Sequence, residues 1–143
     1  MFSKNQEEAR SYINDKQFGL ANELPVIEKL TIHFENEVVK SKGGYCNYDA
    51  EDSSSIYEIK SRRCSSKTYA TTIIPVKKTL IDTKNKRLVF VFAFSDGLYY
   101  IVYHKELFTT FQIKNIHTYR NGIIELPLPH YFIPVDLLTK INI

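Results

Sequence analysis

Apolar residues near the start of the chain recur at the spacing of an α-helix. Five of them follow one another at intervals of three or four positions: Leu20, Leu24, Ile27, Leu30 and Phe34. This spacing predicts a helix over about residues 20–34, in which Pro25 is tolerable because it lies near the first turn. Ser3 followed by Gln6 reads as a capping box that opens a shorter helix before Gly19.

The middle of the chain shows the patterns of β-strands. The segment SIYEIKSRR, residues 55–63, alternates in the way a strand does. The segment RLVFVFAFSDGLYYIVYH, residues 87–104, holds two apolar runs joined by Asp96-Gly97, the preferred dipeptide of a two-residue hairpin turn. The first run is apolar at nearly every position, as expected of a strand covered on both faces.

Weaker patterns complete the expected order of elements. Gly43-Gly44 reads as a turn, and Pro75 suits the first position of a short helix. The remaining expectations are strands over residues 38–39, 45–48, 111–116 and 123–128, a short helix over 76–83 and a closing helix over 134–141. Helix, strands, helix and strands in this order predict one α/β (α+β) domain over residues 1–143, with a mixed β-sheet flanked by helices.

The composition of the chain indicates a soluble protein rather than a membrane or secreted one. Hydrophobic residues make up 43% and charged residues 24% of the 143 residues, which is typical of a soluble domain. No apolar run approaches the roughly 20 residues of a membrane span, and the first residues lack the apolar stretch of a secretory signal. We therefore expect an intracellular protein with no membrane partner, in which Cys46 and Cys64 are reduced thiols. The net charge of +3 is compatible with a polyanionic partner.

Three polar residues around residues 49–60 suggest a reactive site. Glu58 and Lys60 are two apart in a predicted strand, so their side chains leave the same face of the sheet. Asp49 lies nine positions before Glu58, across a turn that can place the two carboxylates together. Converging carboxylates form a hard oxygen site suited to Mg²⁺ or Mn²⁺. A lysine beside them can hold or deprotonate an attacking water.

Glu23 is a fourth candidate from a separate part of the chain. On a helical wheel it falls inside the apolar arc of the helix over residues 20–34, whereas Glu28 falls at the edge of that arc. A glutamate on a core-facing stripe is costly unless it is paired or coordinated. Glu23 is therefore predicted to point towards the metal, with Glu28 as the fallback.

The order and spacing of these residues resemble those of PD-(D/E)XK nucleases. The matching segments are FGLANELPVIEKL, YCNYD and YEIKSRR, which place a glutamate in the first core helix, an aspartate after a turn and E-x-K in the next strand. The glycine before the helical glutamate, and Ser-Arg after E-x-K, look especially like archaeal Holliday-junction resolvases and small viral or phage endonucleases. The resemblance covers roughly residues 18–105, and Tyr48 stands where the family often has proline.

The resemblance implies a restriction-endonuclease-like core and a metal-dependent DNA endonuclease that hydrolyses phosphodiester bonds. Asp49, Glu58 and the Ile59 carbonyl would hold one or two divalent ions, with Glu23 completing the site and Lys60 orienting the nucleophile. A Holliday-junction resolvase would act as a homodimer, because a branched substrate needs two sites. Basic residues that follow E-x-K are the candidates for phosphate contacts: Arg62, Arg63, Lys67, Lys77 and Lys78.

Two other hypotheses compete with the nuclease. A catalytically inactive nuclease-like module would keep the fold for DNA binding or assembly. An interaction protein would use E-x-K as a surface ion pair, which requires that Glu23, Asp49, Glu58 and Lys60 lie far apart. Within the nuclease hypothesis, a structure-dependent or weakly specific enzyme is favoured, since no extra segment is available for base readout.

Overall fold

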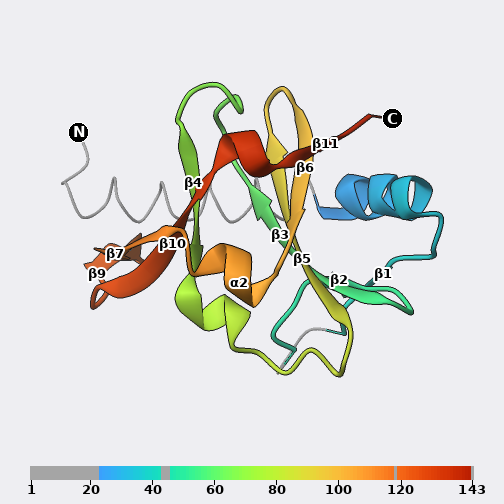
Figure 1. Ribbon diagram of the computed structural model, residues 1–143, viewed down its shortest axis with the longest axis horizontal. Coiled ribbons are helices and arrows are strands. Elements are labelled where there is room, and N and C mark those ends of the chain that lie inside the picture. Colours follow the sequence, from blue (N-terminus) through green and yellow to red (C-terminus); the bar gives the residue numbers. More distant parts are fainter. Residues whose placement is uncertain (1–22, 43–45, 118, 143) are drawn as a thin grey trace.

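The computed structural model describes residues 23–42, 46–117 and 119–142, which form an α/β fold with a mixed sheet (Figure 1). The expected short helix before Gly19 and the Gly43-Gly44 turn lie outside these residues. The main sheet of the described chain has the order β1 (Val39–Lys40), β2 (Ala50–Glu51), β3 (Ser55–Ser61), β5 (Arg87–Phe94), β6 (Gly97–Val102), β11 (Thr139–Ile141). A second sheet has the order β4 (Thr71–Pro75), β10 (Leu128–Pro134), β7 (Gln112–Ile116), and a small hairpin joins β8 (Tyr119–Arg120) to β9 (Ile123–Ile124).

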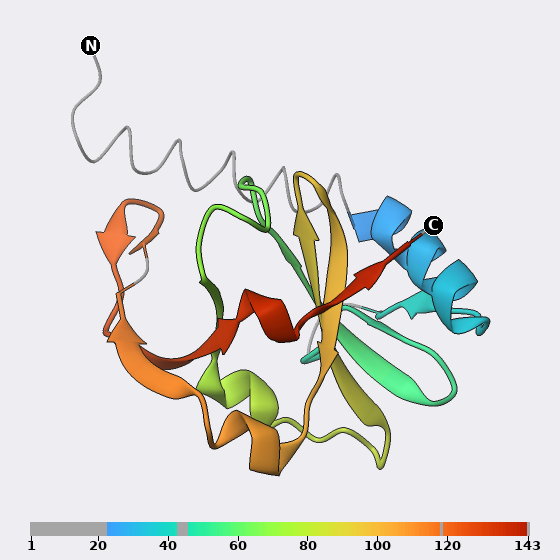
Figure 2. The same cartoon turned by 45° about the horizontal axis from the view of Figure 1, so that its top comes forward.

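Residues 23–34 form a helix on one face of the main sheet (Figure 2). Val26, Ile27 and Leu30 are buried against Tyr57 and other apolar side chains of the sheet. The helix ends at residue 34 as predicted, but its buried face is shifted, since Leu24 is 60% exposed. None of the described helices is long and apolar enough to cross a membrane.

The second sheet covers the opposite face of the main sheet, together with the short helix α2 (Lys105–Phe108). The main sheet is thus the middle one of three layers, between the helix at residues 23–34 and the second sheet, and strand β5 lies within it. Phe90 and Phe92 are fully buried in the cluster beside the second sheet, whereas Val89 and Val91 are fully buried beside the helix. The prediction that this strand is covered on both faces is confirmed. Each such side chain contributes about 1.5–3 kcal/mol through burial.

The connection from β3 to β5 makes the sheet mixed. These two strands are parallel, while the other four pairings of the main sheet are antiparallel. Parallel neighbours need a crossover, and here it consists of β4 and the 3₁₀-helix η1 (Val76–Thr79). Sequence patterns predicted a longer helix over residues 76–83 and missed β4. Pro75 ends β4 and is the N-cap of η1, one position before the first helical position that was predicted for it.

The β5–β6 hairpin forms as predicted, with its turn displaced by one residue. Phe94 pairs with Gly97, so the two turn residues are Ser95 and Asp96 rather than Asp96-Gly97. Asp96 accepts hydrogen bonds from the Ser66 N–H and hydroxyl at 2.8 and 2.6 Å. Gly97 opens β6 with φ +152°, a conformation that L side chains rarely adopt. A tertiary contact of Asp96 therefore accompanies the shifted turn.

The end of the chain differs from its sequence pattern. Residues 134–141 were expected to form a closing helix, but only Val135–Leu137 form a 3₁₀ turn, η2. Strand β11 follows and pairs with β6 at the edge of the main sheet. Ile141 is buried in the cluster beneath the helix at residues 23–34. Pairing with an open sheet edge outweighs the weak helical pattern here.

Asp52 fixes the turn between β2 and β3. Its carboxylate is buried and accepts hydrogen bonds from the N–H groups of Ser54 and Ser55 at 2.8 and 2.7 Å, and from the Tyr57 hydroxyl at 2.6 Å. The last bond joins the turn to a fully buried side chain of β3. The geometry of this hairpin positions Asp49 relative to Glu58.

Asp52→Ala is expected to lower the free energy of unfolding by roughly 2–5 kcal/mol, because it leaves the buried Ser55 N–H and Tyr57 hydroxyl without their hydrogen-bond acceptor. Urea denaturation monitored by circular dichroism measures the change. Asp82→Ala is the matched control, since this exposed aspartate accepts one hydrogen bond, from the Lys84 N–H. Similar losses in the two variants would show that Asp52 does not hold the hairpin.

Candidate active site

Strand β3 presents Glu58 and Lys60 on the face that turns away from the helix. Neighbouring Tyr57 and Ile59 pack on the helix side of the sheet, as the alternation of a strand requires. The predicted strand and the common face of E-x-K are therefore confirmed. Glu58 pairs in register with Phe90 of the central strand β5, and its side chain is buried.

Asp49 lies next to the start of β2, in a bend over residues 47–49, rather than at the end of a strand over 45–48 as predicted. Its Oδ2 accepts a hydrogen bond from the Ile59 N–H at 2.7 Å, and its own N–H donates to the Tyr57 carbonyl at 2.9 Å. Asp49 thus extends the β2–β3 ladder by one side-chain bond. The expected approach of Asp49 to the E-x-K segment is confirmed.

The two carboxylate oxygens of Glu58 have different surroundings. Its Oε1 lies 3.2 Å from Lys60 Nζ and 3.5 Å from Lys78 Nζ. Its Oε2 is buried and, within the described chain, has no hydrogen-bond partner. An unsatisfied buried oxygen costs free energy, more so on an ionised group. Glu58 therefore has one oxygen neutralised by two ammonium groups and one left to accept a further ligand.

Electrostatics link the three acidic residues of the motif. The pKa of Glu58 is raised above its ordinary value, first by burial and also by the nearby charge of Asp49, although Lys60 and Lys78 oppose the shift. The pKa of Glu23 is also raised, by burial and then by Asp49. The charge of Asp49 thus acts on both glutamates. Glu23 is half-buried and Glu28 is exposed, but among the described residues Glu23 does not join Asp49 and Glu58 in one metal-binding group.

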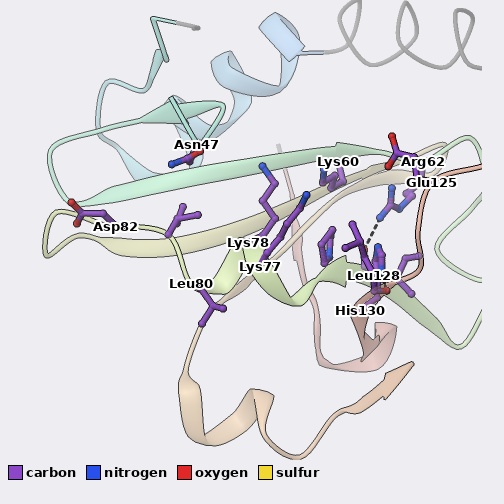
Figure 3. A pocket seen from close by; sticks show the side chains of 13 residues that line it. Asn47, Lys60, Arg62, Lys77, Lys78, Leu80, Asp82, Glu125, Leu128 and His130 are labelled. Atoms are coloured by element: carbon purple, nitrogen blue, oxygen red, sulfur yellow. Dashed lines mark hydrogen bonds between the residues drawn. The ribbon is translucent and has the colours of Figure 1, made fainter. Parts of the chain in front are cut away.

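A cleft of about 800 Å³ opens beside this cluster (Figure 3). Figure 3 shows Lys77 and Lys78 reaching from η1 towards β3, where Lys60 lies. The residues that line the cleft are Asn47, Lys60, Arg62, Ile73, Pro75, Lys77, Lys78, Leu80, Ile81, Asp82, Glu125, Leu128 and His130. Four cations against two carboxylates give the cleft a positive balance, which suits a polyanion.

The candidate phosphate-binding residues separate into two groups. Arg62, Lys77 and Lys78 line the cleft, whereas Arg63 and Lys67 are exposed and are not among its lining residues. Arg62 also links the two sheets: its Nη2 donates to the Ile73 carbonyl at 2.8 Å and its Nε to the Thr72 hydroxyl at 3.3 Å. Its guanidinium is therefore held in place at the cleft rather than presented on a flexible stem.

Sequence reasoning missed part of the site. Lys78, predicted to contact nucleic acid, also forms an ion pair with Glu58, across the crossover that joins β3 to β5, and no sequence pattern indicated this pair. Asn47 and His130 also line the cleft and carried no signal in the sequence, because they come from segments far apart along the chain. The hydrogen bond between His130 Nδ1 and the Leu128 carbonyl, 2.8 Å long, orients that imidazole.

The donor atoms at Asp49 and Glu58 fit a hard divalent cation. The Asp49 carboxylate is bound to the Ile59 peptide, next to Glu58 in the chain, and the unpartnered Glu58 Oε2 is the kind of atom that a metal ligand set would use. The Ile59 N–H points to Asp49, and the carbonyl of a strand residue points to the same side as its N–H. Among the described residues no three His, Cys, Asp or Glu side chains form a metal-binding group, so the fit rests on two carboxylates and a backbone carbonyl.

Comparison with known proteins adds no relative: no family model, curated protein or solved structure significantly matches the chain.

Proposed function

We propose that the protein is a metal-dependent DNA endonuclease with a restriction-endonuclease-like core, in which Asp49, Glu58, Lys60 and Glu23 form the active site. The observation that carries the proposal is the environment of Glu58. One oxygen of this buried carboxylate contacts two lysines, the other is unpartnered, and Asp49 is bound to the adjacent peptide of Ile59. A surface ion pair would be exposed and would not need this arrangement.

The placement of the motif on the fold supports the proposal. Glu23 lies in a helix, Asp49 lies in a bend directly before β2, and Glu58 and Lys60 occupy the next long strand. This is the order that the PD-(D/E)XK resemblance implies. Asp49 accepts from the Ile59 N–H and Lys60 pairs with the buried Glu58, so three of the four residues meet at β3, which an incidental surface E-x-K pair would not require.

Asp49, Glu58 and the Ile59 carbonyl would hold Mg²⁺ or Mn²⁺, with Glu23 completing the site. When bound, the ion lowers the pKa of a water and neutralises charge on the scissile phosphate. Lys60 orients the nucleophilic water and stabilises charge on the phosphate, and Lys78 keeps a second positive charge beside the same carboxylate. Arg62 and Lys77 contact neighbouring phosphates along the cleft.

The proposed substrate is DNA, cut in a structure-dependent or weakly sequence-dependent manner. The cleft offers charged side chains suited to phosphates. Cleavage of a four-way junction in the manner of a Holliday-junction resolvase would require two such sites, supplied by a homodimer.

The test is a cleavage assay with labelled four-way junction, duplex and single-stranded DNA, in Mg²⁺, Mn²⁺ or EDTA. We expect cleavage in either metal, none in EDTA and none by Asp49→Asn. Mn²⁺ at a hundred times its Kd should also stabilise the parent by about 2.7 kcal/mol, and the variant by much less. DNA binding without cleavage or metal-induced stabilisation would instead favour the inactive binding module. Absence of binding as well would contradict both.

A further inference from the structure

A second pocket, of about 380 Å³, adjoins the cationic cleft. Its lining residues are Arg62, Cys64, Ser65, Tyr69, Thr71, Thr72, Ile73, Phe94 and Phe132. Arg62 and Ile73 line both the pocket and the cleft, so the two are neighbours. The volume lies within the range of about 300–1,000 Å³ that small-molecule sites occupy, and the exposed lining is mostly apolar.

Three aromatic rings give this pocket its character. Tyr69 lies in the loop between β3 and β4 and is 68% exposed, whereas Phe94 and Phe132 are half-buried at β5 and β10. Lys114 places its ammonium 5.2 Å from the centre of the Phe132 ring, which adds a positive charge beside the pocket. An exposed tyrosine beside two further rings offers a flat apolar surface on which a ring-shaped ligand can stack.

We infer that this pocket stacks an unpaired base of a DNA strand whose phosphates lie in the adjacent cleft. A nucleotide joins an apolar, flat base to an anionic phosphate, and here an aromatic pocket adjoins four cationic side chains of the cleft. Arg62, fixed between the two by its bonds to β4, lies where the sugar-phosphate joins the base. A base inside a duplex is stacked on its neighbours, so the pocket selects DNA with unpaired nucleotides.

This inference rests on the proposed function, because it assigns the kind of DNA that the same site receives. The test measures binding of a fluorescein-labelled 15-nucleotide single strand by anisotropy in EDTA, so that cleavage plays no part. Tyr69→Ala is expected to weaken binding roughly 5- to 100-fold, as loss of one base–aromatic contact does. Tyr69→Phe should restore it. Ile32→Ala, which truncates an exposed side chain of the helix, is the matched control.

Two further binding measurements distinguish stacking of a base on Tyr69 from attraction of the phosphates to the cationic side chains. Binding of the matching duplex should change little in Tyr69→Ala. Replacing bases by abasic residues, which keeps every phosphate, should weaken binding by the parent and not by Tyr69→Ala. Equal weakening of single-strand and duplex binding, or no weakening of either, would overturn the base pocket.

The cleavage assay is read separately from these measurements. If DNA is cleaved but Tyr69→Ala binds single strands as the parent does, the base pocket is contradicted and the proposed nuclease activity stands. If Tyr69→Ala weakens binding of single strands but no DNA is cleaved, the nuclease activity is contradicted and the pocket is a binding site for single-stranded DNA.

Discussion

Glu58→Gln is expected to lower metal-dependent cleavage of DNA at least about 1,000-fold, because an uncharged amide holds a divalent cation and its activated water poorly. The amide has the shape of the carboxylate and keeps an oxygen for Lys60 and Lys78. The fold should therefore be retained. Single-turnover cleavage in Mn²⁺, with saturating enzyme, measures the loss of the chemical step.

Glu51→Gln is the matched control, since this glutamate forms a surface ion pair with Lys86 at 3.1 Å, outside the cleft lining. It should cleave as the parent does. Cleavage by Glu58→Gln within about tenfold of the parent, a difference of only 1.4 kcal/mol in barrier, would exclude Glu58 as a metal ligand.

Glu58→Gln is also expected to be at least as stable as the parent in EDTA near neutral pH. Burial raises the pKa of Glu58 above 4.5 despite the two lysines, so the folded state disfavours the ionised form. Between pH 4.5 and the raised pKa, the folded protein holds a proton that the unfolded chain has lost. The parent therefore loses stability as the pH rises through this window, and Glu58→Gln does not. Thermal unfolding at a series of pH values shows the difference.

Lys60→Met is expected to lower kcat by roughly 100- to 1,000-fold, the usual effect of removing one group that stabilises transition-state charge. Methionine preserves most of the length and apolar stem of lysine but carries no ammonium. Since the nucleotide phosphates also contact other cations of the cleft, KM should change much less. Steady-state kinetics on the preferred DNA separates the two parameters.

Two neighbouring lysines serve as comparisons for Lys60. Lys77→Met removes a cleft cation that has no ion pair with Glu58 among the described contacts, and it should raise KM with little change in kcat. Lys78→Met should fall between them, with a loss in kcat of about tenfold, because it removes a positive charge beside Glu58 but leaves Lys60 to orient the nucleophile. Equal effects of Lys60→Met and Lys77→Met on kcat would show that Lys60 only binds DNA.

Local patterns were sufficient for the parts of the fold that bury a regular apolar face. The alternation in SIYEIKSRR predicted β3, and the apolar run over residues 88–94 predicted a strand covered on both sides. The helix ending at residue 34 was also predicted, although its buried face was not quite right. In each case the side-chain period of the element matches the burial that the fold provides.

Elements that depend on long-range pairing were missed or misassigned. Strand β4 has its partner in β10, nearly sixty positions later, and β11 becomes a strand because β6 offers an open edge. Likewise, the hairpin turn moved to Ser95-Asp96, where Asp96 binds Ser66. A local window of sequence holds none of these partners, so propensity alone cannot decide such segments.

The chemistry of the site divides in the same way. The sequence alone was enough to predict that Glu58 and Lys60 share one face of a strand, because a two-residue period fixes it, and that Asp49 lies across a turn from them. Only the tertiary structure decided that Lys78 is the second cation on Glu58, that Glu58 Oε2 is buried without a partner, and that Tyr69 lies in a pocket beside the cleft. These contacts join segments that the β3–β5 crossover and the second sheet bring together, and their residues share no local period that a sequence pattern can report.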